Sequence, residues 1–311
     1  MRSGRVGGYQ GGQSLVTPRL SIVFLNFNRV NETRYSVEYL RQLLTGRNDI
    51  EVIAVDNGST DGTADYLAAQ DDFLTPVLLP DNGGIAGYNV GFQQARGAII
   101  LVLDDDSHPY DIACLDRLIE LLGQQPEVGI IACRIEDKHG QRADSWHLPK
   151  DDQAGPSMAF IGCGFAIQRA LFETIGWYPT TFFLYQNEMD VAIKTRLHGY
   201  RIQYDPACRV VHRSEGFPRP GWRRVFFATR NTLWLIRRYY PYPQALYLIV
   251  SRIVIGLARA VQFRQLPAYW RGLREGLSVA QPRQLLPVEL RAEFAPFWRQ
   301  NSVWHQLLKL A

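Results

Sequence analysis

The amino-acid sequence predicts an α/β protein with a mostly parallel central sheet, followed by a C-terminal α-helical region. Three observations lead to this prediction. Short runs rich in Val, Ile and Leu alternate with helix-period segments through the first two-thirds of the 311 residues. Polar or Gly-rich residues follow each run, and the last third is instead basic and rich in Trp. Near-continuous apolar runs separated by helical segments are typical of parallel strands that are covered by helices on both faces.

Four apolar runs are the predicted strands, and they are Leu20–Asn26, 51–56, 76–79 and 98–103. Helical periodicity predicts helices over 85–96, 111–123 and 188–197. In sheets of this kind, ligands bind at the carboxyl ends of the strands. We therefore expect the residues that directly follow each run to carry the function.

Three acidic residues, Asp104, Asp105 and Asp106, directly follow the run 98–103. Three carboxylates at a strand end repel one another unless a cation or a hydrogen-bond network compensates them. Carboxylate oxygens are the ligands that Mg²⁺ and Mn²⁺ prefer. The sequence alone leaves a second interpretation open, in which the acids form a solvated loop and Asp111 caps the helix that follows.

Two other loops stand at strand ends. Residues 56–63 (DNGSTDGT) place Asp56 where its carboxylate could accept the ring N–H of a uracil or thymine, although the same residues are also good turn formers. Asn82-Gly83-Gly84 predicts a close-approach loop that leaves free helix N–H groups for an anion. The chain contains neither a G-x-G-x-x-G nor a Walker A sequence.

Taken together, these motifs resemble those of the family 2 glycosyltransferases, in the family's order, over residues 20–213. The resemblance implies a GT-A fold, which is a Rossmann-like nucleotide-sugar domain. It also implies a set of nucleotide-sugar-binding residues, namely Asn26, Asn28, Arg29, Asp56, Asn57, Asn82, Gly83, Gly84, Asn89, Asp104 and Asp105.

The resemblance further implies a divalent cofactor, Mg²⁺ or Mn²⁺. The acidic run stands where the family has its metal-binding D-x-D motif, so Asp106 is the implied direct ligand and Asp104 lies nearer the ribose. His212, near the end of a short predicted strand, matches a family histidine that reaches the metal or the diphosphate. A histidine with a purely structural role is the other interpretation of this position.

The implied catalytic residues are Glu188 and Asp190. The family usually has Glu-Asp-x-Asp here, whereas this chain has Asn187-Glu188-Met189-Asp190, so the implied base is Glu188. In the first turn of the helix 188–197, the helix dipole favours the ionised, proton-accepting form of Glu188. Without the motif, an ordinary acid at a helix N-terminus would be the simpler interpretation.

The implied activity is metal-dependent, inverting transfer of one sugar from a pyrimidine nucleotide-sugar to a hydroxyl of a glycan or lipid-linked acceptor in cell-surface polysaccharide synthesis. The stretch 82–91 is similar to that of rhamnosyltransferase-like members, which favours dTDP-rhamnose as the donor, with a UDP-sugar next. The alternative is a non-catalytic nucleotide-sugar-binding or membrane scaffold protein on the same fold.

Charge and composition predict three parts. Residues 1–18 are rich in Gly, Ser and Gln and are expected to be a flexible tail, without the apolar run of a signal peptide. Residues 19–217 form the predicted catalytic domain. Residues 218–311 hold 15 Lys and Arg against three acids, and five of the seven tryptophans. The four cysteines lie far apart in the sequence, so neither a disulfide framework nor a structural zinc site is expected.

The basic part contains an apolar segment, 244–263, that is interrupted by Arg252 and Arg259. These two arginines are seven residues apart and share one helical face, with a broad apolar face opposite. Such a helix fits an anionic membrane interface, so we expect a cytoplasmic protein that is peripheral on the inner face of the cell membrane. Packing on the catalytic domain, or a homo-oligomer seam, competes with this hypothesis, and nucleic acid is not an expected partner.

Overall fold

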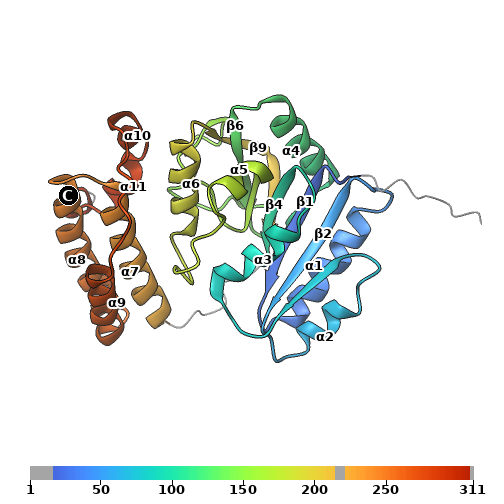
Figure 1. The fold of residues 1–311 in the computed structure, drawn as a ribbon, viewed down its shortest axis with the longest axis horizontal. Coiled ribbons are helices and arrows are strands. Elements are labelled where there is room, and N and C mark those ends of the chain that lie inside the picture. The colour runs from blue at the N-terminus through green and yellow to red at the C-terminus, as the bar shows by residue number, and fades with distance from the viewer. Residues whose placement is uncertain (1–16, 214–220, 309–311) are drawn as a thin grey trace, which may run out of the picture.

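The computed structural model describes residues 17–213 and 221–308 and confirms the predicted α/β class (Figure 1). Helices cover both faces of a central sheet, and further helices lie beside it at the C-terminal side. The elements up to the middle of the sheet are β1 (Leu20–Asn26), α1 (Val30–Leu43), β2 (Ile50–Asn57), α2 (Thr63–Ala68), β3 (Thr75–Leu79), the 3₁₀ turn η1 (Gly84–Ala86), α3 (Gly87–Gln94), β4 (Ile99–Asp104), β5 (Ser107–Pro109) and α4 (Ile112–Gln124).

The remaining elements complete the sheet and then form a helical region. They are β6 (Val128–Glu136), β7 (Gly155–Pro156), β8 (Gly164–Gln168), α5 (Arg169–Thr174), α6 (Asn187–Leu197), β9 (Arg201–His212), α7 (Gly221–Tyr239), α8 (Gln244–Gln262), α9 (Leu266–Ser278), α10 (Val288–Glu293), α11 (Ala295–Gln300) and α12 (Val303–Leu308). The described strands form one sheet in the order β3-β2-β1-β4-β8-β6-β9-β5, and β7 pairs with β9 outside this path.

Strands β3, β2, β1 and β4 run parallel to one another, and so do β6 and β9. Strand β8 is antiparallel to both of its neighbours, β4 and β6. All four predicted strands are present with nearly the expected bounds. Two expectations need correction: the predicted helix 85–96 begins with the separate turn η1, and His212 ends a strand of 12 residues rather than a short one.

The core follows from alternation along the buried strands. Val23, Val55 and Val102 belong to a cluster on one face of the sheet, whereas Ile22 and Leu101 belong to a cluster on the other. Successive side chains of a strand point to opposite faces, so an apolar run fills both clusters at once. This is why the runs read as continuous rather than alternating in the sequence.

The C-terminal helices share the first of these two clusters. Trp234, Leu235 and Tyr239 of α7 and Leu248 of α8 are buried in the same cluster as Val23. Helix α7 lies beside α6 (Figure 1), and the described C-terminal helices therefore share part of the core of the sheet, while α7, α8 and α9 also form a smaller cluster of their own. Most of the predicted tail 1–18 and the predicted boundary at 217/218 lie outside the described residues.

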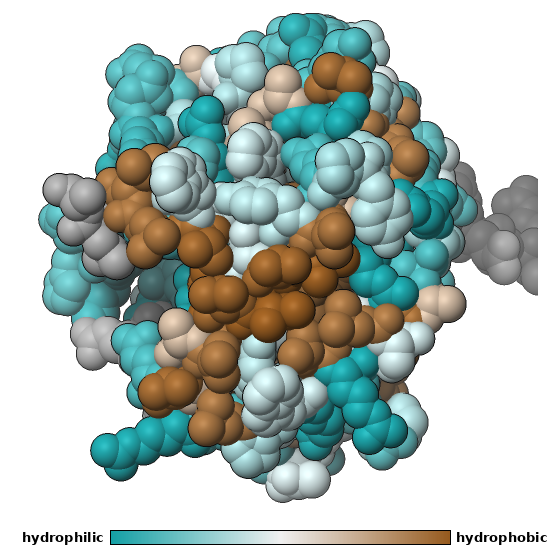
Figure 2. Space-filling model, turned by 90° about the vertical axis from the view of Figure 1, so that its left-hand side faces the viewer, coloured by the Kyte–Doolittle hydropathy of each residue, from teal (hydrophilic) through white to brown (hydrophobic). Residues whose placement is uncertain are grey.

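Helix α8 turns its apolar face outward. Leu246, Val250, Val254, Leu257 and Val261 form an exposed stripe along it, and all but Leu257 are more than half exposed. Figure 2 shows the apolar band over this side of the molecule. Within the described residues, α8 is the one helix long and apolar enough to cross a membrane by length and composition, with a third of its apolar window buried.

Candidate active site

The parallel strands bring the predicted site together at one edge of the sheet. Strand β1 lies between β2 and β4, with Asn26 opposite Asp56 and Leu25 opposite Asp104. Three segments that are distant in the sequence therefore end side by side. This arrangement agrees with the expectation that ligands bind at the carboxyl ends of the strands.

Arg29 compensates the acidic run. Its Nη1 lies 2.7 Å from Asp105 Oδ1 and 2.7 Å from Asp106 Oδ2. Asp105 and Asp106 are buried, and burial raises the pKa of Asp105 well above its usual value although Arg29 opposes this. The pKa of Arg29 is raised by both carboxylates in spite of its own burial. Arg29 and Asp105, both predicted to bind the nucleotide-sugar, therefore contact each other in this structure.

His212 reaches the acidic run through strand pairing. Strands β5 and β9 are antiparallel with Ser107 opposite His212, and His212 Nε2 lies 3.2 Å from Asp106 Oδ1. Burial lowers the pKa of His212, but the hydrogen bond with Asp106 and the charges of Asp106 and Asp104 raise it above its usual value overall. The imidazole is therefore placed by the fold to meet charged groups at this edge.

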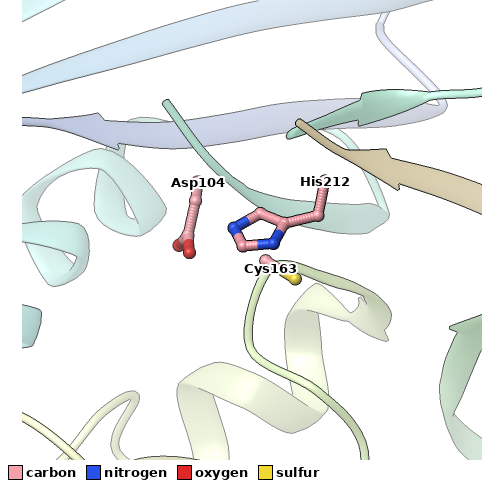
Figure 3. Close-up of side chains that lie close together, drawn as sticks. All are labelled: Asp104, Cys163 and His212. Carbon is pink, nitrogen blue, oxygen red and sulfur yellow. The ribbon is translucent and has the colours of Figure 1, made fainter. Parts of the chain in front are cut away.

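Asp104, Cys163 and His212 form a cluster in which one ligand atom from each residue lies within 4.8 Å of the others (Figure 3). The carboxylate of Asp104 suits Mg²⁺ or Mn²⁺, and the imidazole of His212 suits transition-metal ions. Burial raises the pKa of the Cys163 thiol well above its usual value, which favours the neutral thiol. Asp104 and His212 could therefore hold a divalent ion together, with the carboxylate as the ligand for Mg²⁺ or Mn²⁺. Asp106, the predicted direct ligand, lies next to this cluster with its carboxylate between Arg29 and His212.

Glu188 lies against the loop that carries Cys163. A Cβ atom on Gly162 would come within 2.6 Å of Glu188 Oε1, so a side chain there would displace this carboxylate. The negative charge of Glu188 also contributes to the raised pKa of Cys163. The predicted base is therefore a neighbour of the Asp104 cluster, at the N-terminus of α6.

Asp190 has a different environment from Glu188. It is fully buried and accepts hydrogen bonds from Arg238 Nη1 at 3.0 Å and from the Tyr239 hydroxyl at 2.7 Å, both on α7. Lys194 Nζ lies 2.8 Å from its other carboxylate oxygen. The structure thus gives Asp190, predicted as catalytic, a role in holding α7 onto α6.

Asp56, which is predicted to bind the nucleotide-sugar, has one carboxylate oxygen without a hydrogen-bond partner. It is 1% exposed, and its Oδ2 accepts the Ser59 N–H at 2.9 Å, while its Oδ1 is buried without a hydrogen-bond partner. Buried polar atoms are nearly always paired in folded proteins. The loop around it is fixed from Asn28, whose Oδ1 accepts the Thr60 N–H at 2.7 Å.

The loop Asn82-Gly83-Gly84 corrects the expectation of free N–H groups. Gly83 N–H donates to Asn57 Oδ1 at 3.1 Å, Gly84 N–H donates to Asn82 Oδ1 at 2.8 Å, and Ile85 N–H donates to the Phe183 carbonyl at 2.8 Å. The protein itself therefore satisfies the donors that were expected to meet an anion. The loop does make a close approach as expected, but it approaches Asn57 and the Phe183 carbonyl rather than an anion.

Two further predicted ligands are parts of the scaffold. Asn26 is fully buried, donates to the Val55 carbonyl and accepts from the Thr33 hydroxyl. Asn89 exchanges two hydrogen bonds with the backbone of Tyr178, at 3.0 and 3.1 Å. Both carboxamides join secondary-structure elements and thus have a scaffold role, while their predicted role as nucleotide-sugar ligands stays a prediction.

One loop joins the site to the C-terminal helices. Asn231 Nδ2 of α7 donates to the carbonyls of Phe182, Leu184 and Tyr185 at 2.8–2.9 Å. Phe183 and Tyr185 have left-handed backbone angles, with φ of 57° and 67°, which cost non-glycine residues about 1 kcal/mol or more each. These contacts hold a strained segment that leads directly to α6 and Glu188.

Sequence reasoning missed several residues of the site. Cys163 belongs to the cluster with Asp104 and His212, and the glycines on either side of it, Gly162 and Gly164, were the one sequence signal of a closely packed loop there. Tyr88 donates from its hydroxyl to Asp104 Oδ1 at 2.9 Å, and Arg213 donates to Ser36 Oγ at 2.9 Å beside the acidic run. Neither contact has a local sequence signal, because each partner comes from a distant element.

The chain belongs to glycosyl transferase family 2. The family model described as "Glycosyl transferase family 2" matches residues 21–193, which is more than half of the chain. The match extends from β1 into the middle of α6, and thus includes the strand ends, the acidic run and Glu188.

Several curated proteins are similar over parts of their length. An uncharacterised glycosyltransferase of Nostoc sp. is 28% identical over 120 residues, which is 36% of this chain and 35% of that protein. The O-antigen biosynthesis protein RfbC of Myxococcus xanthus is 24% identical over 225 residues, which is 63% of this chain and 17% of that protein. The chain thus spans about a third or less of the length of these two relatives.

Solved structures confirm the GT-A type of fold. The mannosyltransferase PcManGT from Pyrobaculum calidifontis, in complex with GDP-Man and Mn²⁺, superposes with a TM-score of 0.55 at 18% identity, covering 93% of this chain and 83% of that one. TarS of S. aureus gives a TM-score of 0.60 at 14% identity, covering 91% and 52%. At these identities the likeness concerns the fold.

Proposed function

We propose that the protein transfers one sugar, with inversion, from a pyrimidine nucleotide-sugar to a hydroxyl of a lipid-linked glycan acceptor in surface-polysaccharide synthesis. The observation that carries this proposal is the meeting of three features at one edge of the sheet. They are the unpaired acceptor of Asp56, the cluster of Asp104 with His212, and the carboxylate of Glu188. Binding a base, holding a diphosphate and accepting a proton are the three tasks of such a transferase.

The unpaired Oδ1 of Asp56 supports a pyrimidine base in the donor. Uracil and thymine each carry one ring N–H, and a buried carboxylate oxygen without a partner would accept it. We propose dTDP-rhamnose as the first donor to test and UDP-hexoses next. The family relationship supports a nucleotide-sugar, and the stretch 82–91 supports the rhamnosyl choice by resemblance.

Asp104 and His212 would hold Mg²⁺ or Mn²⁺ together with the donor diphosphate. When bound, such an ion supplies Lewis-acid stabilisation of the charge on the leaving diphosphate. The similar structure of GalNAc-T7, solved with UDP, GalNAc and Mn²⁺, supports this choice of cofactor. Asp106 and Arg29 position the acidic run through their ion pair.

Glu188 takes the proton from the attacking hydroxyl in this proposal. Glu188→Gln keeps the size of the side chain but removes the proton acceptor, so transfer should fall by about 10²- to 10⁴-fold. Donor binding should survive, as measured by calorimetry. Full activity in this variant would disprove the role of Glu188.

The exposed stripe of α8 supports contact with an anionic membrane surface. Trp270 and Trp304 are also more than half exposed on the C-terminal helices, and Trp favours the membrane interface. We propose a peripheral position on the inner face of the cell membrane, where a lipid-linked acceptor would be presented. The relationship to an O-antigen biosynthesis protein agrees with this acceptor class. Self-association through the same stripe would instead appear as concentration-dependent dimers in solution.

A donor panel tests the proposed function. The full chain is incubated with dTDP-rhamnose, UDP-glucose or UDP-galactose, with Mn²⁺ or Mg²⁺ and a membrane lipid extract, and release of the nucleoside diphosphate is followed. We expect one donor to turn over and the metal-free reaction to be slow. Donor binding without any turnover would favour the non-catalytic alternative, a nucleotide-sugar-binding scaffold.

A further inference from the structure

A cavity of about 290 Å³ lies between α7 and α8, and none of its lining residues belongs to the candidate active site. Arg224 lines it from α7, and Arg252 and Arg259 line it from α8. Thr229 and Gln262 add a hydroxyl and a carboxamide, and the described lining residues include no acid. The volume is near the lower end of small-molecule sites, which span roughly 300–1,000 Å³.

Arg252 is the unusual member of this set. It is 4% exposed, its Nε has no hydrogen-bond partner, and among the described residues it makes no ion pair. Burial, together with the positive charge of Arg259, lowers the pKa of Arg252 to about 10. A buried charge without a partner is costly, so proteins normally pair such groups.

A second buried arginine shows how the same helices satisfy this requirement. Arg230 of α7 is 9% exposed, lies 3.4 Å from Glu275 Oε2 and donates to the carbonyls of Thr181 and Phe182. Arg252 has no equivalent set of partners among the described residues. Among the described residues the cavity therefore offers Arg252 no counter-charge, and an anion bound there would supply one.

We propose that the cavity between α7 and α8 binds a phosphate group, held by Arg252 and Arg259 and supported by Arg224. Guanidinium groups form paired, charge-assisted hydrogen bonds with phosphate oxygens, and all three cations here are Arg rather than Lys. This site goes beyond the proposed function, because the donor diphosphate is assigned to Asp104 and His212. A soluble phosphate ester and a lipid phosphate share this chemistry.

Thermal unfolding of the full chain tests the soluble source. Inorganic phosphate and pyrophosphate are titrated in EDTA, without donor, against the wild type and the Arg259→Ala, Arg252→Met and Arg274→Ala variants. Arg259 is exposed, so its substitution should leave folding intact, and the exposed Arg274 of α9 is the matched control. We expect at least a tenfold loss of affinity in the first two variants and none in the control.

Co-sedimentation with vesicles tests the lipid source. Vesicles of phosphatidylcholine alone and with added phosphatidylglycerol are compared for the same four proteins. Binding to the anionic vesicles only, with a tenfold loss in Arg259→Ala and Arg252→Met, assigns the site to a lipid phosphate, whereas a response to soluble phosphate assigns it to a soluble ester. The proposal is overturned if no phosphate source binds, or if both cavity variants bind as the wild type does. Because no donor is present, this failure would leave the proposed transfer reaction untouched.

Discussion

Asp190 provides the sharpest test of how the catalytic part and the C-terminal helices depend on each other. Its carboxylate is fully buried and meets Arg238, Tyr239 and Lys194. Removing one partner of a buried ion pair typically costs 3–5 kcal/mol. The side chains of Arg238 and Lys194 keep 14% and 18% of their exposure, so solvent compensates them in part. We therefore expect Asp190→Asn to lower the free energy of unfolding by about 3 kcal/mol.

Tyr239→Phe is the matched variant, because it removes only one hydrogen bond to the carboxylate. Hydrogen bonds to charged groups contribute about 1.5–3 kcal/mol, so the loss should be smaller than for Asp190→Asn. Urea unfolding, followed by Trp fluorescence and circular dichroism, measures both variants, and initial rates are taken below the unfolding transition. A stable Asp190→Asn protein with a hundredfold lower rate would refute the structural role and favour a chemical one.

Three further variants test other parts of the structure. Asp56→Ala removes a charged hydrogen-bond acceptor that contributes about 1.5–3 kcal/mol, so the KM for a pyrimidine nucleotide-sugar should rise by about 10- to 100-fold. A panel of nucleotide-sugars shows whether the preference for pyrimidines relaxes, and an unchanged KM would contradict the proposed base contact. Gly84→Ala should destabilise the protein, because Gly84 has φ +63° and a Cβ atom would lie 2.2 Å from the Phe183 carbonyl oxygen. An unchanged melting temperature would contradict this and show that the loop can move aside. Glu136 tests the acid limit of stability: although burial raises its pKa, hydrogen bonds from Arg209 and Arg134 lower it overall. Its stabilisation is therefore complete above the pKa of the unfolded chain, about 4.3, and is lost as the pH falls through the lower folded value. Glu136→Gln should flatten the acid side of the stability curve between these two values, and an unaltered curve in urea titrations at pH 3–6 would contradict this.

The predictable parts of the fold are those with local signals. Buried parallel strands are short apolar runs, so Leu20–Asn26 and its neighbours could be recognised directly. Asp56 and Asp104 stand at the ends of two of these strands, so their places at the edge of the sheet could be predicted as well. Asp111 caps α4, as the sequence also suggested. In these cases the residues that decide the structure are adjacent in the chain.

The parts that could not be predicted depend on pairings between distant segments. Arg252 and Arg259 share a helical face as expected, but that face turns toward α7, so Arg252 is buried and the apolar face is exposed. The N–H groups of Gly83 and Ile85 looked free because their acceptors, on Asn57 and Phe183, lie 26 and 98 residues away. A helical wheel or a loop motif contains no information about such partners.

The contact between Asn231 and the segment 182–185 limits how this protein can be recombined with its relatives. A chimera joined within 214–220 would keep the strained backbone of Phe183 and Tyr185 but would receive a foreign helix in place of α7. Three carbonyls and the buried carboxylate of Asp190 would then face side chains that did not evolve with them. A chimera that folds must therefore take the segment 181–190 and the C-terminal helices from the same parent, although these two segments are not adjacent in the sequence.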